Sequence, residues 1–426
     1  MAFAPIVMAA ADAAEYAAEA APARAEKGGP ALHATPMMRR LATPWMVSYA
    51  RAGLLEDVAL PPGVVLDPAC GSAAQLAALC IRLGRPGIGV ELSGEVAPLA
   101  AVNLDACAAW AGDAPWLGAS RILCGDGTAG DAVRDAYHAS LAEAGMPAKP
   151  PIALLHVDPA RPNDAQRHIL DEMEPALDVL LDGWAAHLSL GTGPAGGAPA
   201  PALLLDLSPR LSDAQRAEVD AIVEARWPGA ATTWQWMTQG RGRIDRLSLW
   251  VGPLALPEPA RLIRLDRTGD MTGLTGVSTT TEAAPDADAK TVGAHLTVVD
   301  PALLASGLAS TWAASAFDGP LTWVEVEGRR PACLSDSAPS DDVFVQASGR
   351  IEAVLAAPDY TGDLLEIAEN WAQAAEDVGR IALRCPVPPE VQPRLQKLLD
   401  RSLRHAEGDD CFIASTGDDH FLCRPC

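Results

Sequence analysis

The chain has 426 residues, which is too long for one average domain of about 150 residues and favours two or three domains. Hydrophobic residues make up 49% and charged residues 20%, a balance that is typical of a protein with a sizeable core and excludes general disorder. The formal net charge is −23. A protein this acidic repels phosphate backbones unless its basic groups are clustered, which argues against unselective coating of DNA.

The segment 1–60 precedes the first clear strand and is expected to be a helical N-terminal extension. Residues 5–24 are Ala-rich, and residues 36–60 have helical spacing with a break at Pro44. The apolar opening contains acidic residues and lacks a cationic lead, which argues against a signal peptide. No later run approaches the ~18 apolar residues that span a bilayer, so we expect a soluble cytoplasmic protein without a membrane partner.

From residue 61 to residue 267 apolar strands alternate with helical segments. The predicted strands are VVLDPA (64–69), GIGVEL (87–92), RILCGD (121–126), IALLHVDPA (152–160) and PALLLDLSP (201–209), and the predicted helices are 73–83, 96–109, 132–144 and 175–188. This alternation predicts an α/β fold, a Rossmann-like doubly wound and mostly parallel sheet with helices on both faces. Residues 191–201 are predicted to be a loop, and 232–239 with 246–254 an antiparallel hairpin at one sheet edge.

A second shift in composition comes at 268–292, which lacks apolar periodicity and is predicted to be a linker. Beyond it, residues 293–426 combine apolar strands with a helix from about Leu364 to Ala375 and an amphipathic helix over 388–403. This pattern predicts a smaller α+β domain of ordinary size.

Acidic residues follow four consecutive predicted strands, at Asp67, Glu91, Asp126 and Asp158. The carboxyl ends of parallel strands meet at one edge of a sheet, where open α/β folds bind ligands. A carboxylate at the end of the second strand is placed to bind both ribose hydroxyls of a nucleoside cofactor. The small residues of 71–73 come before a helix, so backbone amides can approach an anionic group there.

This order of motifs resembles the class I S-adenosylmethionine-dependent methyltransferases, over residues 64–253. The resemblance implies S-adenosyl-L-methionine as the cofactor, with Asp126 meeting the adenine amino group. The implied cofactor-binding residues are Asp67, Ala69, Gly71, Ser72, Glu91, Asp126 and Gly127. The turn Gly71-Ser72-Ala73 has fewer glycines than the G-x-G that is usual in this family. A Rossmann-like domain for another nucleotide is the alternative, although the dinucleotide pattern G-x-G-x-x-G is absent.

A narrower resemblance rests on DPAR (158–161), ATPWMVSYARA (42–52), LLLDLSPRL (203–211), the 234–252 hairpin and the strings RIALRCPVPPEVQPRLQKLL (380–399) and CFIASTGDDHFLCRP (411–425). These segments are similar to bacterial methyltransferases that carry a C-terminal THUMP-like domain. Such modules are linked with RNA, so the resemblance implies an RNA base, in tRNA or rRNA, as the acceptor and does not imply DNA. Pro162 stands where the family usually has a second Arg.

The residues themselves give weaker support for RNA. Clustered arginines can form a phosphate-binding face on an acidic protein. Two groups occur, Arg241, Arg243, Arg246, Arg261, Arg264 and Arg267, and Arg380, Arg384, Arg394, Lys397, Arg401 and Arg404. A solvated face paired with nearby acidic residues is the alternative interpretation. The sequence does not predict the oligomeric state.

The predicted acceptor site comprises Asp158, Pro159 and Arg161. A methyl group on sulfonium is already electrophilic, so the protein mainly positions donor and acceptor while a proton leaves. Asp158 is placed to accept from an exocyclic amine, and Arg161 to hold a phosphate or the cofactor carboxylate. The alternative for Asp158-Pro159 is a strand-ending turn. Covalent attack on a pyrimidine carbon needs a cysteine nucleophile, which in the pyrimidine C5 enzymes follows the fifth strand. That strand ends here in Asp206-Leu207-Ser208-Pro209, so C5 chemistry is disfavoured, transfer to nitrogen is favoured, and Cys70 is interpreted as a packed motif residue.

No metal site is predicted. Cys411, His420, Cys423 and Cys426 could bind zinc chemically, but their spacing is unusual and strand alternation explains two of the cysteines. His156 lies in an apolar strand and is expected to be a core histidine. Two other functions stay open, a non-catalytic RNA-binding or adaptor protein with a cofactor-shaped domain, and a methyltransferase of protein or small molecules.

Overall fold

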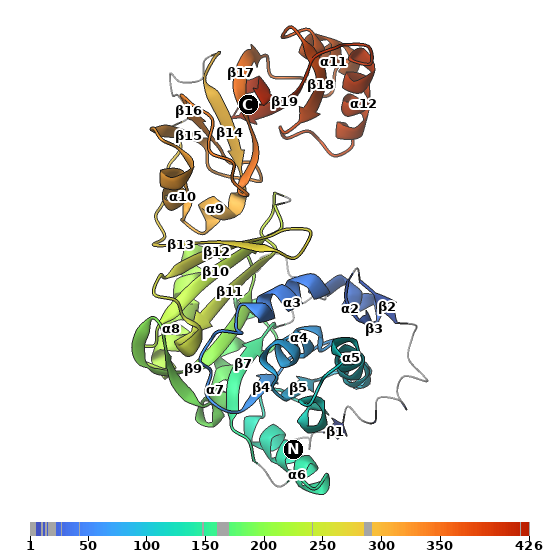
Figure 1. The fold of residues 1–426 in the computed structure, drawn as a ribbon, viewed down its shortest axis with the longest axis vertical. Coiled ribbons are helices and arrows are strands. Elements are labelled where there is room, and N and C mark those ends of the chain that lie inside the picture. Colours follow the sequence, from blue (N-terminus) through green and yellow to red (C-terminus); the bar gives the residue numbers. More distant parts are fainter. Residues whose placement is uncertain are drawn as a thin grey trace. The chain divides into compact units, whose positions relative to one another are not determined.

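The structure of the protein is a computed structural model, and it describes residues 6–9, 12, 15, 23–26, 28–41, 43–146, 149–159, 170–240, 242–284, 292–417 and 419–425 (Figure 1). The chain forms two compact units. The first contains Met1–Gln235, Arg246–Pro259 and Arg267–Met271, and the second contains Trp236–Asp245, Ala260–Asp266 and Thr272–Cys426.

The first unit is built on a large, mostly parallel sheet. Its strands follow the order β1-β6-β5-β4-β7-β9-β11-β10. The parallel strands are β4 (Val64–Asp67), β5 (Gly87–Glu91), β6 (Arg121–Cys124), β7 (Ile152–Val157) and β9 (Gly196–Leu207). In chain order they occupy positions 3-2-1-4-5, the order of a doubly wound α/β sheet. This arrangement confirms the predicted fold class.

The sheet of the first unit ends its parallel series at β9, next to which β11 (Arg246–Val251) runs antiparallel. Leu247 is paired with Leu207, and β10 (Thr232–Thr238) follows β11 in the strand order. The two strands that were predicted as a hairpin are therefore neighbours, with β11 placed inside the sheet and β10 farther out.

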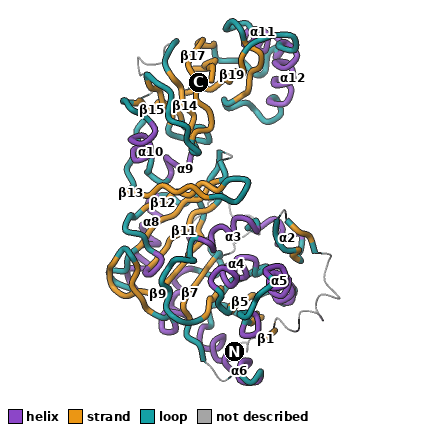
Figure 2. Tube along the Cα trace, viewed as in Figure 1, coloured by secondary structure: helices purple, strands orange, loops and turns teal. Residues whose placement is uncertain are grey.

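Helices cover both faces of this sheet (Figure 2). On one face α3 (Trp45–Gly53), α4 (Ala74–Leu83) and α5 (Val96–Ala111) pack in succession, and α6 (Gly130–Glu143) packs against α7 (Leu177–Trp184). Alanine and leucine fill α4 and α5, which favours helix and allows close packing. A capping box at Ser212 starts α8 (Asp213–Arg226).

The prediction of a helix over residues 5–24 is partly wrong. Residues Ile6–Ala9 form strand β1, which pairs antiparallel with Cys124–Arg121 of β6. The short apolar run completes the open edge of the sheet, and this long-range pairing overrides the helix propensity of the alanines. Two short strands, β2 (Arg24–Ala25) and β3 (Ala31–Leu32), pair with each other before α2 (Pro36–Leu41). Residues 5, 10, 11, 13, 14 and 16–22 of the expected helix lie outside the described residues.

The predicted loop over 191–201 is also wrong. Strand β8 (Leu190–Gly193) pairs antiparallel with the first part of β9, and Gly193 opposes Gly196. Gly196 has φ +74° and Gly197 has φ +84°, a left-handed backbone that glycine adopts without strain. The glycines therefore make a tight hairpin turn, whereas composition alone suggested an irregular connection.

The second unit is an α+β arrangement around a seven-stranded sheet in the order β15-β16-β14-β17-β20-β19-β18. Its strands are β14 (His295–Val299), β15 (Leu321–Glu325), β16 (Ala332–Ser335), β17 (Val345–Leu355), β18 (Val378–Leu383), β19 (Asp409–Thr416) and β20 (Asp419–Pro425). Among the described strand pairs of this sheet, only β18 and β19 run parallel. Helices α11 (Leu364–Ala372) and α12 (Gln392–Ser402) pack against each other beside β18 (Figure 1).

Other elements of the second half are short. Helices α9 (Pro301–Ala305) and α10 (Ala309–Ala316) follow β14, and strand β12 (Ala260–Leu265) precedes β13 (Met271–Gly276). Strand β13 lies within the stretch 268–292 that was expected to be a linker, and residues 285–291 lie outside the described residues. The side chains of β13 are half-buried or exposed, and Met271 and Leu274 are its large apolar residues, so the sequence shows no apolar alternation there.

Within the described ranges, no helix has the length and apolar character needed to cross a membrane. In the same part of the chain, no three His, Cys, Asp or Glu side chains are placed to hold a metal. Cys411 and Cys423 are buried in β19 and β20, and Cys426 lies outside the described residues.

Gly127 is the tightest glycine beside the parallel strand ends. A Cβ atom there would lie 1.9 Å from the carbonyl oxygen of Pro68. We predict that Gly127→Ala lowers the free energy of unfolding by about 1–3 kcal/mol, since backbone must shift to relieve the overlap. Urea unfolding checks this against Gly94→Ala, where a Cβ meets nothing within 4 Å. Equal stability of the two variants would contradict the prediction.

Candidate functional site at the carboxyl edge of the parallel sheet

The turn after β4 brings backbone amides close to the end of β5. Gly71 has φ +52° and Ala73, which precedes α4, has φ +58°, so the chain takes a left-handed path there. The amide of Gly71 donates to Oε2 of Glu91 at 3.1 Å, and the amide of Ser93 donates to Oε1 at 2.8 Å. Burial raises the pKa of Glu91 from its ordinary value, while these two amides oppose the shift.

The space beside this turn is open. A Cβ atom at Gly71 would meet nothing within 4 Å, and the Leu92 side chain that follows Glu91 is 77% exposed. Asp126, after β6, is also exposed, and its Oδ1 accepts from the amide and hydroxyl of Thr128 at 2.9 and 2.7 Å. An exposed apolar side chain that follows a carboxylate at a strand end is suited to the face of a nucleoside.

Asn103 of α5 ties this turn to the N-terminal segment. Its side-chain nitrogen donates to the carbonyl oxygens of His33 and Ser72 at 2.9 and 3.0 Å. Its side-chain oxygen accepts from the amide of His33 at 2.7 Å. The Asn103 side chain is completely buried, and its one bond to Ser72 and two bonds to His33 link the turn after β4 to the segment before α2.

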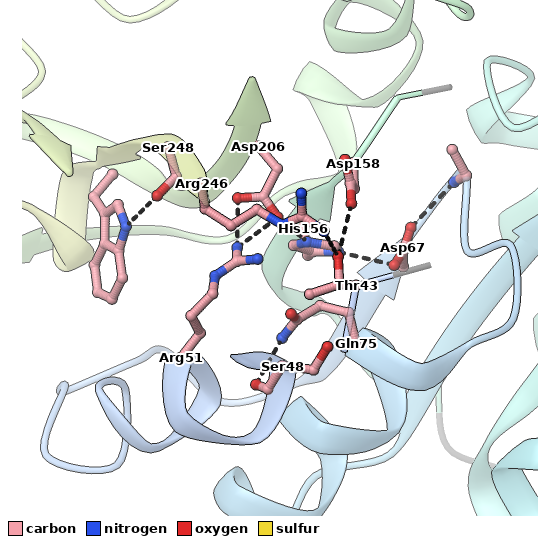
Figure 3. Close-up of polar contacts among 12 residues, drawn as sticks. Thr43, Ser48, Arg51, Asp67, Gln75, His156, Asp158, Asp206, Arg246 and Ser248 are labelled. Atoms are coloured by element: carbon pink, nitrogen blue, oxygen red, sulfur yellow. Dashed lines mark hydrogen bonds and ion pairs between the residues drawn. The ribbon is translucent and has the colours of Figure 1, made fainter. Parts of the chain in front are cut away.

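A network of buried charges lies behind the strand ends (Figure 3). His156 of β7 bonds Oδ2 of Asp67 through Nδ1 at 2.8 Å and Oδ2 of Asp206 through Nε2 at 3.0 Å. Arg51 of α3 donates to both oxygens of Asp206. His156 and Arg51 are 0% exposed. Nε and Nη1 of Arg51 have no partner among the described residues.

The network settles the charge of its own members. Burial lowers the pKa of His156, but Asp67 and Asp206 outweigh it and raise that pKa to about 9. Burial raises the pKa of Asp206, but Arg51 and His156 outweigh it and lower that pKa to about 2. His156 is therefore an imidazolium at neutral pH that donates to two carboxylates, and it cannot act there as a base.

Asp158 lies at the end of β7, beside this network. The Thr43 hydroxyl is 3.5 Å from Oδ2 of Asp158, and Nη2 of Arg246 donates to the Thr43 oxygen. Burial and Asp206 raise the pKa of Asp158, and Arg246, His156 and Arg51 oppose that shift. The carboxyl group of Asp158 is half-buried, so a bound molecule can reach it while charged side chains lie nearby.

The structure brings together several of the residues predicted from the sequence. Asp67, Glu91, Asp126 and Asp158 lie at the carboxyl ends of β4, β5, β6 and β7. The amide of Ala69 donates to Oδ1 of Asp67 at 3.2 Å, and Gly71 bonds Glu91. Gly127 packs below Pro68, and Pro159 is buried. Arg161 lies outside the described residues.

Five residues near Asp158 were missed by the sequence interpretation as parts of a site. They are Thr43, Arg51, His156, Asp206 and Arg246. His156 is indeed buried, as expected of a core histidine, but it belongs to an ionic network. The signal in the sequence was an ionisable residue within an otherwise apolar segment, at Arg51, His156 and Asp206. Ionisable residues that are buried together are expected to pair with one another.

The comparisons with known proteins give no family by sequence. No family model matches the chain, and no curated protein matches it. The similar solved structures include methyltransferases. A Listeria monocytogenes protein provisionally assigned to the class I S-adenosylmethionine-dependent methyltransferases shows 18% identity and a TM-score of 0.31 over 50% of this chain. The matched part spans 61% of that protein.

Two further structures differ in their acceptors. The M protein of the type I restriction enzyme EcoKI shows 14% identity and a TM-score of 0.29, with 53% of this chain and 48% of that chain covered. An O-methyltransferase from Bacillus cereus in complex with SAH shows 14% identity and a TM-score of 0.28, with 57% and 90% covered. TM-scores this low do not establish a shared fold, so the fold class follows from the strand order.

The raised pKa of His156 predicts a pH-dependent stability. The imidazolium is favoured in the folded protein, so its contribution is fully present below the ordinary value of 6.5 and is lost as pH rises through about 9. We expect the free energy of unfolding to fall by about 3 kcal/mol over this interval. Urea unfolding across pH measures the loss, and nitrogen-15 NMR of the imidazole gives the pKa directly.

The matched control for this prediction is His405→Gln, because His405 is exposed. That variant should keep the pH dependence of the unmodified protein. His156→Gln should remove it and lower stability at neutral pH, since two buried carboxylates lose their partner. An imidazole that titrates near its ordinary pKa would contradict the proposed charge state.

Proposed function

We propose that the protein is an S-adenosylmethionine-dependent methyltransferase that transfers methyl to a nitrogen of an RNA base. The observation that carries this proposal is the set of carboxylates at four adjacent strand ends, Asp67, Glu91, Asp126 and Asp158. In doubly wound sheets this edge is where nucleotide cofactors bind.

The residues at the edge fit such a cofactor. Glu91 retains acceptor capacity for the ribose hydroxyls, and the open backbone at Gly71 leaves room for the methionine part. Leu92 offers an apolar surface to the adenine, and Asp126 is placed to meet its amino group. Asp67, Ala69, Ser72 and Gly127 complete the proposed cofactor-binding set. When bound, S-adenosylmethionine supplies an electrophilic methyl group.

The chemistry proposed for Asp158 is to orient the acceptor and take its proton. A carboxylate accepts a hydrogen bond from an N–H group, which directs the nitrogen lone pair, and receives the proton that this nitrogen loses. Asp158 is suited to this task because its pKa is raised and it is half-buried. Pro159 holds the turn, and Arg161 is proposed to bind a phosphate or the cofactor carboxylate.

The cysteine route to a carbon acceptor is not supported. Cys70 is 8% exposed, and burial, Asp67 and Glu91 all raise the pKa of its thiol. A thiol in this environment is a poor nucleophile. In the pyrimidine C5 enzymes the cysteine nucleophile follows the fifth strand. The corresponding strand here, β9, ends in Leu207 and is followed by Ser208 and Pro209, so no cysteine stands there.

An exposed basic patch of the second unit supports a polyanionic acceptor. The patch consists of Arg380, Arg384, Arg394, Lys397, Arg401 and Arg404, on and around β18 and α12. All six side chains are exposed, and none forms an ion pair with another described residue. The alternative of a face neutralised by nearby acids is thereby weakened, and free cations on an acidic protein favour phosphate binding.

The other arginine group does not form a comparable patch among the described residues. Arg246 belongs to the candidate site, Arg243 pairs with Asp245 at 3.1 Å, and the Arg264 guanidinium lies against Gly240. Arg241 lies outside the described residues. The RNA proposal therefore depends on the patch around α12.

The domain assignment is part of this proposal. We assign catalysis to a domain over 61–267, an N-terminal extension to 1–60, a linker to 268–292 and a THUMP-like RNA-binding domain to 293–426. Cytoplasmic location accompanies an RNA-modifying role. RNA is preferred to DNA because of the resemblance to THUMP-containing proteins.

Glu91 separates a methyltransferase from an adaptor that only retains the fold. We predict that Glu91→Ala weakens cofactor binding about ten- to a hundredfold, because one or two charge-assisted hydrogen bonds to ribose are lost. Isothermal titration calorimetry measures the affinity, and the control is Glu218→Ala on the exposed face of α8. Methyl transfer should fall with affinity, whereas partner binding that survives without any transfer would favour the adaptor.

The basic patch separates RNA from other acceptors. We predict that the triple change Arg394→Gln, Lys397→Gln and Arg401→Gln weakens binding of a fluorescein-labelled RNA hairpin and reduces the salt dependence of log K by about two. Fluorescence anisotropy at several salt concentrations measures both. The control changes Arg134, Arg216 and Arg226 to Gln, three arginines paired with acids in the first unit. Equal affinities for the two triple variants would move the acceptor away from nucleic acid.

The decisive experiment uses radiolabelled S-adenosylmethionine and an extract of a deletion strain. Label in the RNA fraction that ribonuclease removes would support the proposal. Label in DNA, protein or small molecules would identify another acceptor, and cofactor binding without label in any fraction would favour the adaptor.

A further inference from the structure

The Thr43 hydroxyl can donate one hydrogen bond, and Asp158 is the acceptor within reach. Arg246 donates to the Thr43 oxygen, and a guanidinium has no acceptor capacity, so this bond uses a lone pair of the hydroxyl. The hydroxyl proton therefore remains available, and the Asp158 oxygen lies 3.5 Å away. A carboxylate can accept that proton as a hydrogen bond, and such catalytic contacts are often long before substrate binds.

The two residues reach Asp158 from different parts of the chain. Thr43 lies between α2 and α3, before the first strand of the parallel series, and Arg246 begins β11. Thr43 is 9% exposed, so the hydroxyl is largely shielded from competing water. Figure 3 shows Thr43 below Asp158, with His156 beside them. The acceptor site thus includes residues from outside the strand-end motifs.

We propose that Thr43 and Arg246 are positioning residues that hold the Asp158 carboxylate as the acceptor of a substrate N–H, an inference that rests on the proposed methyl transfer. The Thr43 hydroxyl donates to one carboxylate oxygen and leaves the other lone pairs for the substrate. Arg246 fixes the hydroxyl and places a positive charge near Asp158.

The charge around Asp158 supports this role. Asp206 of β9 disfavours the ionised carboxyl, while Arg246 of β11, His156 of β7 and Arg51 of α3 favour it. Asp67 of β4 faces His156 on the opposite side. With Asp158 ionised, the three acids Asp67, Asp158 and Asp206 balance the three cations. An acceptor that brings a donor N–H suits this balance, whereas an anionic acceptor atom would be repelled by the carboxylate.

The test combines carbon-13 NMR of the Asp158 carboxyl, assigned with Asp158→Asn, and the pH profile of kcat/KM. The variants are Arg246→Gln, Thr43→Val and the conservative Thr43→Ser, and the control is Arg216→Gln, whose side chain pairs with Asp213 on α8. Cofactor affinity is measured for each variant, so that folding and cofactor binding are monitored separately from the carboxyl.

The expected results have definite directions. Arg246→Gln removes a favourable charge, so the pKa of Asp158 should rise by about one unit and the acidic limb of the profile should move to higher pH by the same amount. Thr43→Val should lower kcat about tenfold with cofactor affinity unchanged, and Thr43→Ser should restore it. Arg216→Gln should change neither quantity.

Two failures are distinguishable. If the protein transfers methyl but Arg246→Gln leaves the pKa of Asp158 in place and Thr43→Val matches Thr43→Ser, the positioning role is overturned. If the unmodified protein transfers no methyl group while NMR shows the expected shift, the proposed function fails and the local arrangement around Asp158 stands.

Discussion

The first unit depends on one buried cation. His156 lies between Asp67 and Asp206, and Arg51 binds the second of these carboxylates. Burial of a charge away from water costs free energy unless the charge has partners. Loss of a single member of such a group therefore leaves an uncompensated buried charge. Because the members come from α3, β4, β7 and β9, the same contacts that satisfy the charges fix the relative positions of four elements.

This constraint explains why the strand ends can serve chemistry. The two carboxylate oxygens of Asp67 have different partners. Oδ1 accepts from the Ala69 amide, and Oδ2 accepts from His156. The turn above it and the network behind it are therefore held by the same side chain. Asp158 lies at the border of that network, where its carboxyl group has charged neighbours and is only half-buried.

The sequence predicted the elements that local patterns determine. Alternating apolar segments gave the strand and helix order of the sheet, and the acids at strand ends gave Asp67, Glu91, Asp126 and Asp158. Strands β1 and β8 were missed because their pairing depends on distant or glycine-rich partners. The network was missed because Arg51 and Asp206 are 155 residues apart, and His156 and Asp67 are 89 apart. No local pattern reports such a contact.

Strand β1 has a practical consequence for anyone who shortens the protein. Its four residues cover the outer side of β6, and that side carries backbone amides and carbonyls that would otherwise be unpaired. Removal of the residues before β4 would therefore expose the edge of β6 that β1 covers. Such an edge can recruit the same edge of another molecule, so truncated preparations should aggregate more readily.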